Sequence, residues 1–241
     1  MKKIVGIIPA RYASSRFPGK PLIDIGGKSM IQRVYEQCLK TSILNHVVVA
    51  TDDERIARKV NEFGGNVVLT ASHHQSGTDR CAEALSKLNN TYDVVINIQG
   101  DEPFINPKQI ELLAEAFLNP HTEIASLIKE ITAEEEINNP NVVKAIFNKL
   151  DEAIYFSRSP IPYKRNKDFP THYYKHIGIY AYRADVLPKL TQLKMGTLEQ
   201  IESLEQLRWI ENRLVIRLCK TDLETIAVDT PEDLERILKT L

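Results

Sequence analysis

The segment IVGIIPARYASSRFPGKP, residues 4–21, decides the fold of this chain. It begins with an apolar run rich in β-branched residues, from Ile4 to Ile8, and Pro9 ends that run. A short apolar run without polar alternation is typical of a strand buried on both faces of a parallel sheet. The sequence therefore predicts a buried first strand that leads into a loop of small and basic residues.

Similar runs follow along the chain and alternate with helical patterns. Strands are predicted at 47–50, 67–69 and 94–98. Apolar residues at helical spacing predict helices at 30–39, 56–63, 81–88 and 110–117, with Gly64 and Gly65 as a stop signal and Pro107 as a start signal. This order predicts right-handed crossovers and an α/β fold with a Rossmann-like, doubly wound, mostly parallel sheet. Ligands then collect where the strands end.

The pattern changes after about residue 140. Strands are predicted at 142–147, 153–156, 177–182 and 215–219, and helices at 198–210 and 231–241. The segment 157–175 between them is rich in prolines and basic residues, which favours a long loop or protruding arm that acts as a lid or a subunit contact. We expect one domain, 1–241, with a smaller β-rich subdomain or arm.

Composition excludes several classes of protein. The net charge of −1 provides no basic excess for nucleic acid or an acidic membrane. Cys38, Cys81 and Cys219 are widely spaced, which argues against a disulfide framework or a zinc site and predicts buried thiols. Pro9 and Arg11 interrupt the apolar start too early for a signal peptide, and we expect a cytoplasmic protein with no membrane segment.

The loop after the first strand combines cations with small residues. Arg11, Arg16 and Lys20 supply positive charge, and their small neighbours leave backbone N–H groups accessible, which suits a triphosphate. A solvated basic loop is the alternative, but the position at the end of the first strand favours a ligand. The loop contains neither GxxxxGK[ST] nor GxGxxG, which argues against P-loop and dinucleotide-binding proteins.

Two acidic segments are candidate metal ligands. Asp101 follows Gly100 at the end of the predicted fourth strand, where a carboxylate can hold Mg²⁺ against phosphate oxygens; an ordinary Gly-Asp turn is the alternative. Asp229 could be a second ligand, or its segment could simply begin a helix at Thr230. The adjacent His73 and His74 match no common zinc spacing.

Six segments together resemble one family over nearly the whole chain. They are PARYASSRFPGKPL (9–22), HQSGTDR (74–80), QGDEP (99–103), YFSR (155–158), HIGIY (176–180) and VDTPEDL (228–234). In this order they are similar to the 3-deoxy-manno-octulosonate cytidylyltransferases, the CMP-Kdo synthetases. The resemblance implies a fold of the nucleotide-diphospho-sugar transferase type. It also implies that Kdo attacks CTP to give CMP-Kdo and pyrophosphate for lipopolysaccharide biosynthesis, with Mg²⁺ as cofactor and a homodimer as the assembly.

The resemblance also assigns roles to residues. It implies a nucleotide-binding half in roughly 1–130 and a sugar-acid-binding and dimerisation half in 131–241. Lys20, Asp101 and Asp229 would be catalytic, and the two aspartates would bind Mg²⁺. CTP would be bound by Ala10, Arg11, Ser14, Arg16, Lys20, Ser76, Gly77, Arg80 and Gln99. The sugar acid would be bound by Arg158, His176, Tyr180, Glu205 and Gln206.

Other interpretations stay open at this point. His176 could be structural, Tyr180 could belong to the core, and Glu205 could be a solvated charge on a helix. The substrate could be another acidic sugar, such as a sialic acid or 8-amino-Kdo. A catalytically silent nucleotide-binding regulator is a further alternative, although such a protein has no need for Lys20 together with two metal-binding carboxylates.

Overall fold

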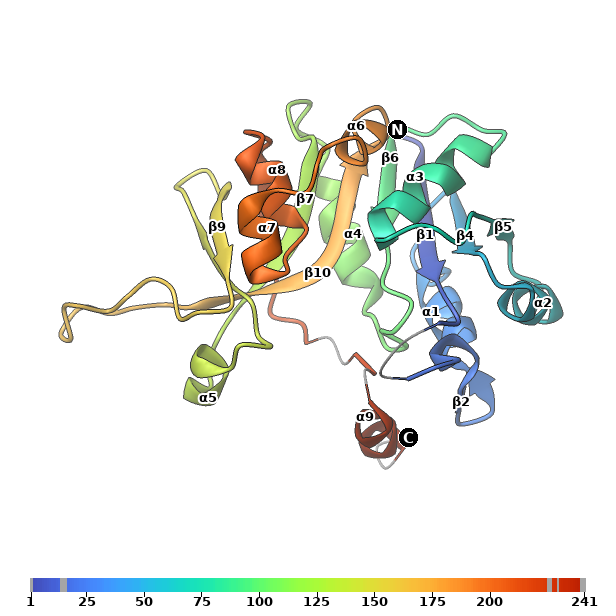
Figure 1. Cartoon of the computed structure of the whole chain (residues 1–241), viewed down its shortest axis with the longest axis horizontal. Coiled ribbons are helices and arrows are strands. Elements are labelled where there is room, and N and C mark those ends of the chain that lie inside the picture. The colour runs from blue at the N-terminus through green and yellow to red at the C-terminus, as the bar shows by residue number, and fades with distance from the viewer. Residues whose placement is uncertain (1, 14–16, 225–226, 229, 239–241) are drawn as a thin grey trace.

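The computed structural model describes residues 2–13, 17–224, 227–228 and 230–238. Within them a 9-stranded sheet runs in the order β11-β7-β10-β6-β1-β4-β5, and β8 and β9 branch from β10 (Figure 1). Its strands are β1 (Ile4–Ala10), β4 (His46–Thr51), β5 (Val67–Leu69), β6 (Val94–Asn97), β7 (Ile124–Glu130), β8 (Lys144–Phe147), β9 (Ala153–Ser157), β10 (Tyr174–Arg183) and β11 (Ile216–Lys220).

Helices cover both faces of the sheet. They are α1 (Met30–Cys38), α2 (Glu54–Glu62), α3 (Gly77–Lys87), α4 (Pro107–Ala116), α5 (Glu134–Asn138), α6 (Leu187–Leu190), α7 (Thr197–Glu202), α8 (Gln206–Glu211) and α9 (Pro231–Leu238). A 3₁₀ turn, η1 (Lys20–Leu22), and a hairpin of β2 (Asp24–Ile25) and β3 (Lys28–Ser29) lie between β1 and α1. No helix in the described part of the chain has the length and apolar character needed to cross a membrane.

The parallel centre of the sheet confirms the predicted fold class. Strand β1 pairs in parallel with β4 on one side and with β6 on the other, and β4 pairs in parallel with β5. Strand β10 is antiparallel to both β6 and β7, so the sheet is mixed. The carboxyl ends of β1, β4 and β6 therefore meet at one edge, and Tyr180 of β10 lies opposite Asn97 at the end of β6.

Strand β1 continues two residues further than predicted, because Pro9 does not end it. Ile7 accepts a hydrogen bond from the N–H of Ile98, at 2.9 Å, so the backbone groups of residues 7 and 9 point toward β6. Strand β6 ends at Asn97, so the missing N–H of Pro9 faces a position beyond the ladder. On the other side Pro9 and Ala10 stay in register with β4.

Two further differences concern the second half of the sheet. Strand β7 was not predicted; Ser126 interrupts its apolar run, and the residue is buried because its hydroxyl bonds to the carbonyls of Ile177 and Ile179. The single helix predicted at 198–210 is in fact α7 and α8, because Ser203 adopts a left-handed conformation with φ of 53°.

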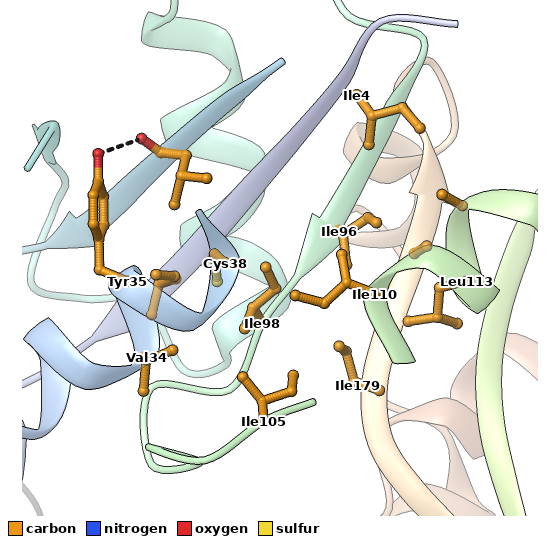
Figure 2. Close-up of a cluster of buried hydrophobic side chains, with 14 of the residues drawn as sticks. Ile4, Val34, Tyr35, Cys38, Ile96, Ile98, Ile105, Ile110, Leu113 and Ile179 are labelled. Carbon is orange, nitrogen blue, oxygen red and sulfur yellow. Dashed lines mark hydrogen bonds between the residues drawn. The ribbon is translucent and has the colours of Figure 1, made fainter. Parts of the chain in front are cut away.

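Side chains alternate between two cores along each strand. Ile4, Ile96 and Ile98 point to the face covered by α1, α2 and α4, where they pack against helix residues such as Ile110 (Figure 2). Tyr35 closes one end of this core, and its hydroxyl donates to the carbonyl of Val47 at 3.2 Å. Cys38 lies within this core, Cys81 is buried on the opposite face, and Cys219 is half-buried.

The opposite core is centred on aromatic rings. Trp209 on α8 is 1% exposed and meets Tyr180 and Tyr182 of β10 edge-on, with ring centroids 5.1 and 5.7 Å apart. Edge-to-face contacts of this kind add to the free energy of burying the rings. Helix α8 is thereby fixed against the same strand that borders the carboxyl edge of the sheet.

The predicted arm is present. Residues 158–173 form neither helix nor strand and extend away from the sheet (Figure 1). Lys144 on β8 fastens the base of the arm, because its fully buried ammonium donates to the carbonyls of Asn139, Val142 and Arg158 at 3.0, 2.7 and 2.5 Å. Burial lowers the pKa of Lys144.

Replacing Trp209 by alanine should destabilise the whole domain. We expect Trp209→Ala to lower the free energy of unfolding by about 3–5 kcal/mol, because the cavity left among Tyr180, Tyr182 and α8 cannot close. Leu118→Ala, at a side chain that is 82% exposed, is the control and should change it by less than about 0.5 kcal/mol. Urea unfolding measures both; equal midpoints for the two variants would contradict the central place of Trp209.

Candidate active site

A pocket of about 260 Å³ lies at the carboxyl edge of the parallel strands. The end of β1, the loop after β6, η1 and the start of α3 enclose it. The described residues that line it are Pro9, Ala10, Arg11, Lys20, Pro21, His74, Gln75, Ser76, Gly77, Arg80, Gln99, Gly100 and Asp101. The structure thus brings together every described residue that the sequence assigned to the nucleotide.

The basic loop is held in place by a stacked pair of side chains. Gly19 has a φ of 73°, which favours glycine, and its N–H donates to the carbonyl of Tyr12 at 2.9 Å. The guanidinium of Arg55 lies 3.3 Å from the centroid of the Tyr12 ring and pairs with Asp53 at 2.6 Å. The start of α2 therefore supports the turn from which Lys20 emerges.

Lys20 and Asp101 meet at the edge of the pocket. The ammonium of Lys20 lies 2.8 Å from Oδ2 of Asp101, and the two side chains are 14% and 31% exposed. Gly100 permits this approach, since a Cβ atom at that position would lie 2.8 Å from the carbonyl oxygen of Pro9. Asp101 also accepts, at its own carbonyl, the N–H of Val228 at 2.9 Å, so the C-terminal segment closes on the same loop.

Asp101 has the chemistry of a ligand for a hard cation. Its carboxylate borders the pocket and already holds a positive charge, the Lys20 ammonium. Hard divalent cations prefer such oxygen ligands. The second predicted ligand, Asp229, lies outside the described residues, as do Ser14 and Arg16. Across the described ranges, no cluster of three or more His, Cys, Asp or Glu side chains forms a metal site.

The neighbouring acid, Glu102, has a different environment. It is 6% exposed, and its Oε2 has no hydrogen-bond partner among the described residues. Burial raises the pKa of Glu102 to about 8, and the charge of Asp101 contributes in the same direction. The two adjacent acids therefore differ in environment, since Asp101 borders the pocket and Glu102 is buried.

The start of α3 presents its backbone to the pocket. Ser76 caps the helix by accepting the N–H of Asp79 at 3.1 Å, and the Asp79 carboxylate accepts the N–H of Ser76 at 3.2 Å. Ser76 and Gly77 line the pocket. A helix N-terminus of this length favours anionic groups because its first N–H groups and its dipole are positive.

Arg80 forms a fixed wall of the pocket and is not a mobile cation. Its guanidinium is nearly buried, donates to the hydroxyl of Thr70 at 2.6 Å and pairs with Asp52 at 2.9 Å. Asp52 had no predicted role. Its signal was its position directly after Thr51, the last residue of β4 and so at the carboxyl edge.

His74 and Gln75 also line the pocket. They belong to the motif HQSGTDR, residues 74–80, but had no predicted role. Nε2 of His74 pairs with Glu83, whose carboxylate also accepts the N–H of Ala71 at 2.9 Å and pairs with Lys87 at 2.6 Å. Lys87 and then His74 lower the pKa of Glu83 to about 2. Glu83 thus ties the loop before α3 to the helix itself.

The residues predicted to bind the sugar acid lie around β10 and α8. His176 bonds the Ser126 hydroxyl through Nε2 at 2.8 Å, and burial lowers its pKa to about 3, so the ring is neutral. The Tyr180 ring lies 5.3 Å from that of His176, and its buried hydroxyl has no partner in the described part of the chain. Gln99 links this region to the pocket by donating to the carbonyl of Gly178 at 2.7 Å.

Glu205 and Gln206 stand at the start of α8. Glu205 accepts the Thr78 hydroxyl at 2.7 Å, so it contacts the first turn of α3 behind the pocket, and the Ser76 hydroxyl acts to lower the pKa of Glu205. It is therefore not the solvated charge that its place on a helix suggested. Gln206 is 5% exposed.

Arg158 lies at the base of the arm and is held by backbone oxygens. Its guanidinium donates to the carbonyls of Glu202, Pro140 and Ser203 at 2.8, 2.9 and 3.4 Å, and its N–H bonds the Glu202 carboxylate at 2.9 Å. These contacts place Arg158 beside the segment that leads into Glu205. As far as the described residues form it, the pocket of about 260 Å³ is not lined by the sugar-acid set.

Sequence comparisons identify relatives of nearly equal length. A family model described as cytidylyltransferase matches residues 5–220. A 3-deoxy-manno-octulosonate cytidylyltransferase from Parabacteroides distasonis is 55% identical and covers 99% of this chain and 98% of its own length. The protein of the same name from Cytophaga hutchinsonii is 56% identical, with 98% and 97% covered.

Solved structures extend the comparison. A CMP:2-keto-3-deoxy-manno-octonic acid synthetase complexed with CTP has a TM-score of 0.94 and 46% identity, covering 99% of this chain and 98% of the other. A cytidylyltransferase from Leptospira borgpetersenii, at 17% identity and a TM-score of 0.64, covers 99% and 86% and shares the fold.

The pair formed by Asp52 and Arg80 should be important for the pocket wall. Asp52→Asn leaves the buried guanidinium without its counter-charge, and we expect a loss of about 2 kcal/mol in the free energy of unfolding. The matched control is Asp151→Asn, whose partner Lys220 is 52% exposed and whose loss should cost below about 0.5 kcal/mol. Urea unfolding distinguishes them; a loss for Asp52→Asn no larger than the control would show that Arg80 needs no counter-charge.

Proposed function

The chain belongs to the cytidylyltransferase family, with 3-deoxy-manno-octulosonate cytidylyltransferases as its close relatives, and we propose that it transfers CMP from CTP to 3-deoxy-D-manno-octulosonate (Kdo). The products are CMP-Kdo, a precursor for lipopolysaccharide biosynthesis, and pyrophosphate. One observation carries the proposal: Lys20 and Asp101, which come from distant loops, meet at 2.8 Å on the rim of a pocket formed by the family motifs.

The reaction is an in-line substitution at phosphorus. The anomeric hydroxyl oxygen of Kdo forms a bond to the α-phosphorus of CTP, the bond from that phosphorus to the bridging oxygen breaks, and pyrophosphate leaves with the electron pair. The hydroxyl proton passes to solvent. The protein must position both reactants and stabilise the negative charge that spreads over the phosphate oxygens. Arg11 and Lys20 supply positive charge at the pocket that balances this negative charge, and we assign Ser14 and Arg16 to binding of the same phosphates.

The nucleotide is held by groups that surround the pocket on several sides. Ala10 ends β1 without side-chain bulk, and the first N–H groups of α3 at Ser76 and Gly77 suit an anionic or polar ligand. Gln99 and Arg80 complete the base pocket, and their side chains are fixed by Gly178, Thr70 and Asp52. Rigid donors of this kind can read a base edge.

Mg²⁺ fits the acidic edge of this pocket. Asp101 places a hard oxygen ligand beside the phosphate-binding loop and pairs with a cation there. We propose that Asp101 and Asp229 hold the ion. When bound, Mg²⁺ would neutralise phosphate charge and favour ionisation of the attacking hydroxyl. Lys20 would pair with the leaving pyrophosphate.

The sugar acid is bound between β10, α8 and the base of the arm, in the second half of the chain. His176 is neutral there and offers hydrogen bonds without charge. The buried hydroxyl of Tyr180 is available for a polyol group, Glu205 and Gln206 add further polar atoms, and the guanidinium of Arg158 suits the carboxylate of the sugar acid. We propose the division into a nucleotide half, about 1–130, and a sugar-acid and dimerisation half, 131–241, on this basis.

We further propose a cytoplasmic homodimer in which the arm, 157–175, contacts the second copy. Tyr163 and Phe169 on the arm are 87% and 66% exposed, and large exposed aromatic residues of this kind are common at protein interfaces.

Pyrophosphate release in the presence of CTP, Mg²⁺ and a panel of acidic sugars tests the proposed activity. We expect release with Kdo and little with a sialic acid or 8-amino-Kdo. Release with one of the other acids instead would reassign the substrate within the same reaction. Binding of CTP without release for any acid would identify a nucleotide-binding regulator and overturn the proposal.

Asp101→Asn should separate catalysis from folding. Without the charge of the carboxylate we expect kcat to fall by at least about 100-fold. In calorimetry, the affinity for Mg²⁺ in the presence of a non-hydrolysable CTP analogue should fall at least about ten-fold. Asp185→Asn, at an exposed carboxylate paired with Arg183, is the control. Turnover and Mg²⁺ affinity close to those of the control would remove Asp101 from the metal site.

A further inference from the structure

A buried line of hydrogen-bonding side chains runs behind the nucleotide pocket and ends on Glu205. Thr78, which is 3% exposed, donates its hydroxyl to Oε2 of Glu205 at 2.7 Å. The Tyr182 hydroxyl lies 3.5 Å from the Thr78 oxygen, and the side chain of Asn97 acts to lower the pKa of Tyr182. These four residues come from α3, the start of α8, β10 and β6, so only the complete fold assembles them.

The hydrogen bonds in this line point in one direction. The single hydroxyl hydrogen of Thr78 goes to Glu205, so Tyr182 is the donor in its contact with Thr78. Asn97 acts to lower the pKa of Tyr182, which is the effect of a side chain that presents its amide hydrogens to the Tyr182 oxygen. Aligned donors polarise one another, and here each step favours negative charge on the Glu205 carboxylate.

This line of side chains lies between the nucleotide pocket and the region assigned to the sugar acid. At one end, Nδ2 of Asn97 lies 3.6 Å from where a Cβ atom on Gly77 would sit, directly beneath the pocket wall. At the other end, Glu205 begins α8 beside Gln206, in the region assigned to the sugar acid. The Ser76 hydroxyl, at the cap of α3, also acts to lower the pKa of Glu205. The line thus joins the walls of the two substrate regions.

We propose that Thr78 is a positioning residue for the sugar acid, because it fixes the Glu205 carboxylate in the orientation in which that carboxylate accepts hydroxyl groups of the substrate. This inference rests on the proposed function and adds to it a residue that need not touch either substrate. Tyr182 and Asn97 contribute more weakly, since the contact of 3.5 Å is long for an O–H···O bond.

Removal of the Thr78 hydroxyl should change the pH dependence of activity as well as the affinity for the sugar acid. Burial raises the pKa of Glu205, and the Thr78 and Ser76 hydroxyls lower it. The other groups that face this carboxylate are Asp79 and Cys81 on α3, Arg208 on α8, and Tyr180 and Tyr182 on β10. Without the Thr78 donor the pKa of Glu205 is higher than in the wild type. As the pH is lowered, the variant therefore loses the ionised carboxylate, and the activity that needs it, at a higher pH than the wild type does.

Steady-state kinetics of Thr78→Val, which keeps the shape and removes the hydroxyl, tests the inference. We expect the KM for Kdo to rise about ten-fold or more, while the KM for CTP stays within about two-fold. The acid limb of the pH profile of kcat/KM for Kdo should move to higher pH. Thr78→Ser restores the hydroxyl and should restore both values.

The controls separate positioning from folding and from the proposed activity. Thr122→Val removes a buried hydroxyl that bonds the carbonyl of Ala116 and should leave both KM values unchanged. Tyr182→Phe changes no residue of α3 and should raise the KM for Kdo about two- to three-fold. It tests the hydrogen bonds that lead to Glu205 even if Thr78→Val fails to fold. Equal rises in both KM values, or no selective rise in any folded variant, would overturn the role of Thr78. Absence of wild-type turnover with Kdo would instead overturn the proposed substrate.

Discussion

The site depends on the close contact between the backbone of Gly100 and the end of β1, which leaves no room for a side chain at residue 100. The space for a side chain at this position is taken by the carbonyl oxygen of Pro9, at 2.8 Å from an added Cβ. Because the chain can cross there, the loop after β6 folds back toward the basic loop after β1, and Asp101 reaches Lys20. Val228 then docks on the same loop. A cationic loop, a carboxylate and the C-terminal segment converge because one residue has no side chain.

Much of this arrangement follows from local pattern. Strands buried on both faces and helices with an apolar stripe are visible in a short window, and their alternation implies the shared carboxyl edge. Arg11 and Lys20, in the basic loop after the first strand, and Asp101, at the end of the fourth, were predicted from local pattern. Ala10, Ser76, Gly77 and Gln99 were assigned by the resemblance, and His74 and Gln75 had no predicted role. Strand β7 was harder to predict, since the hydrogen bonds that bury Ser126 come from β10, far along the chain.

The other residues of the site have roles that depend on contacts between segments far apart in the sequence, which a short stretch of sequence does not reveal. Asp52 and Glu83 gain their roles only when Arg80 and His74 fold against them. Glu205 had the pattern of a solvated helix charge, yet hydroxyl groups of α3 enclose it. The break at Ser203 that places Glu205 depends on a left-handed conformation that a helical spacing does not reveal. The sequence indicated which side chains would lie in the site. The charge state and orientation of those side chains depend on how the fold packs around them.

The bond between Val228 and Asp101 also has a consequence for synthesis on the ribosome. Strands β1, β4, β5 and β6 leave the exit tunnel early and can pair as soon as they emerge. Asp101 is therefore translated long before Val228, which donates to its carbonyl. A nascent chain that stops before Val228 would carry the parallel centre of the sheet without this hydrogen bond to the loop at Asp101.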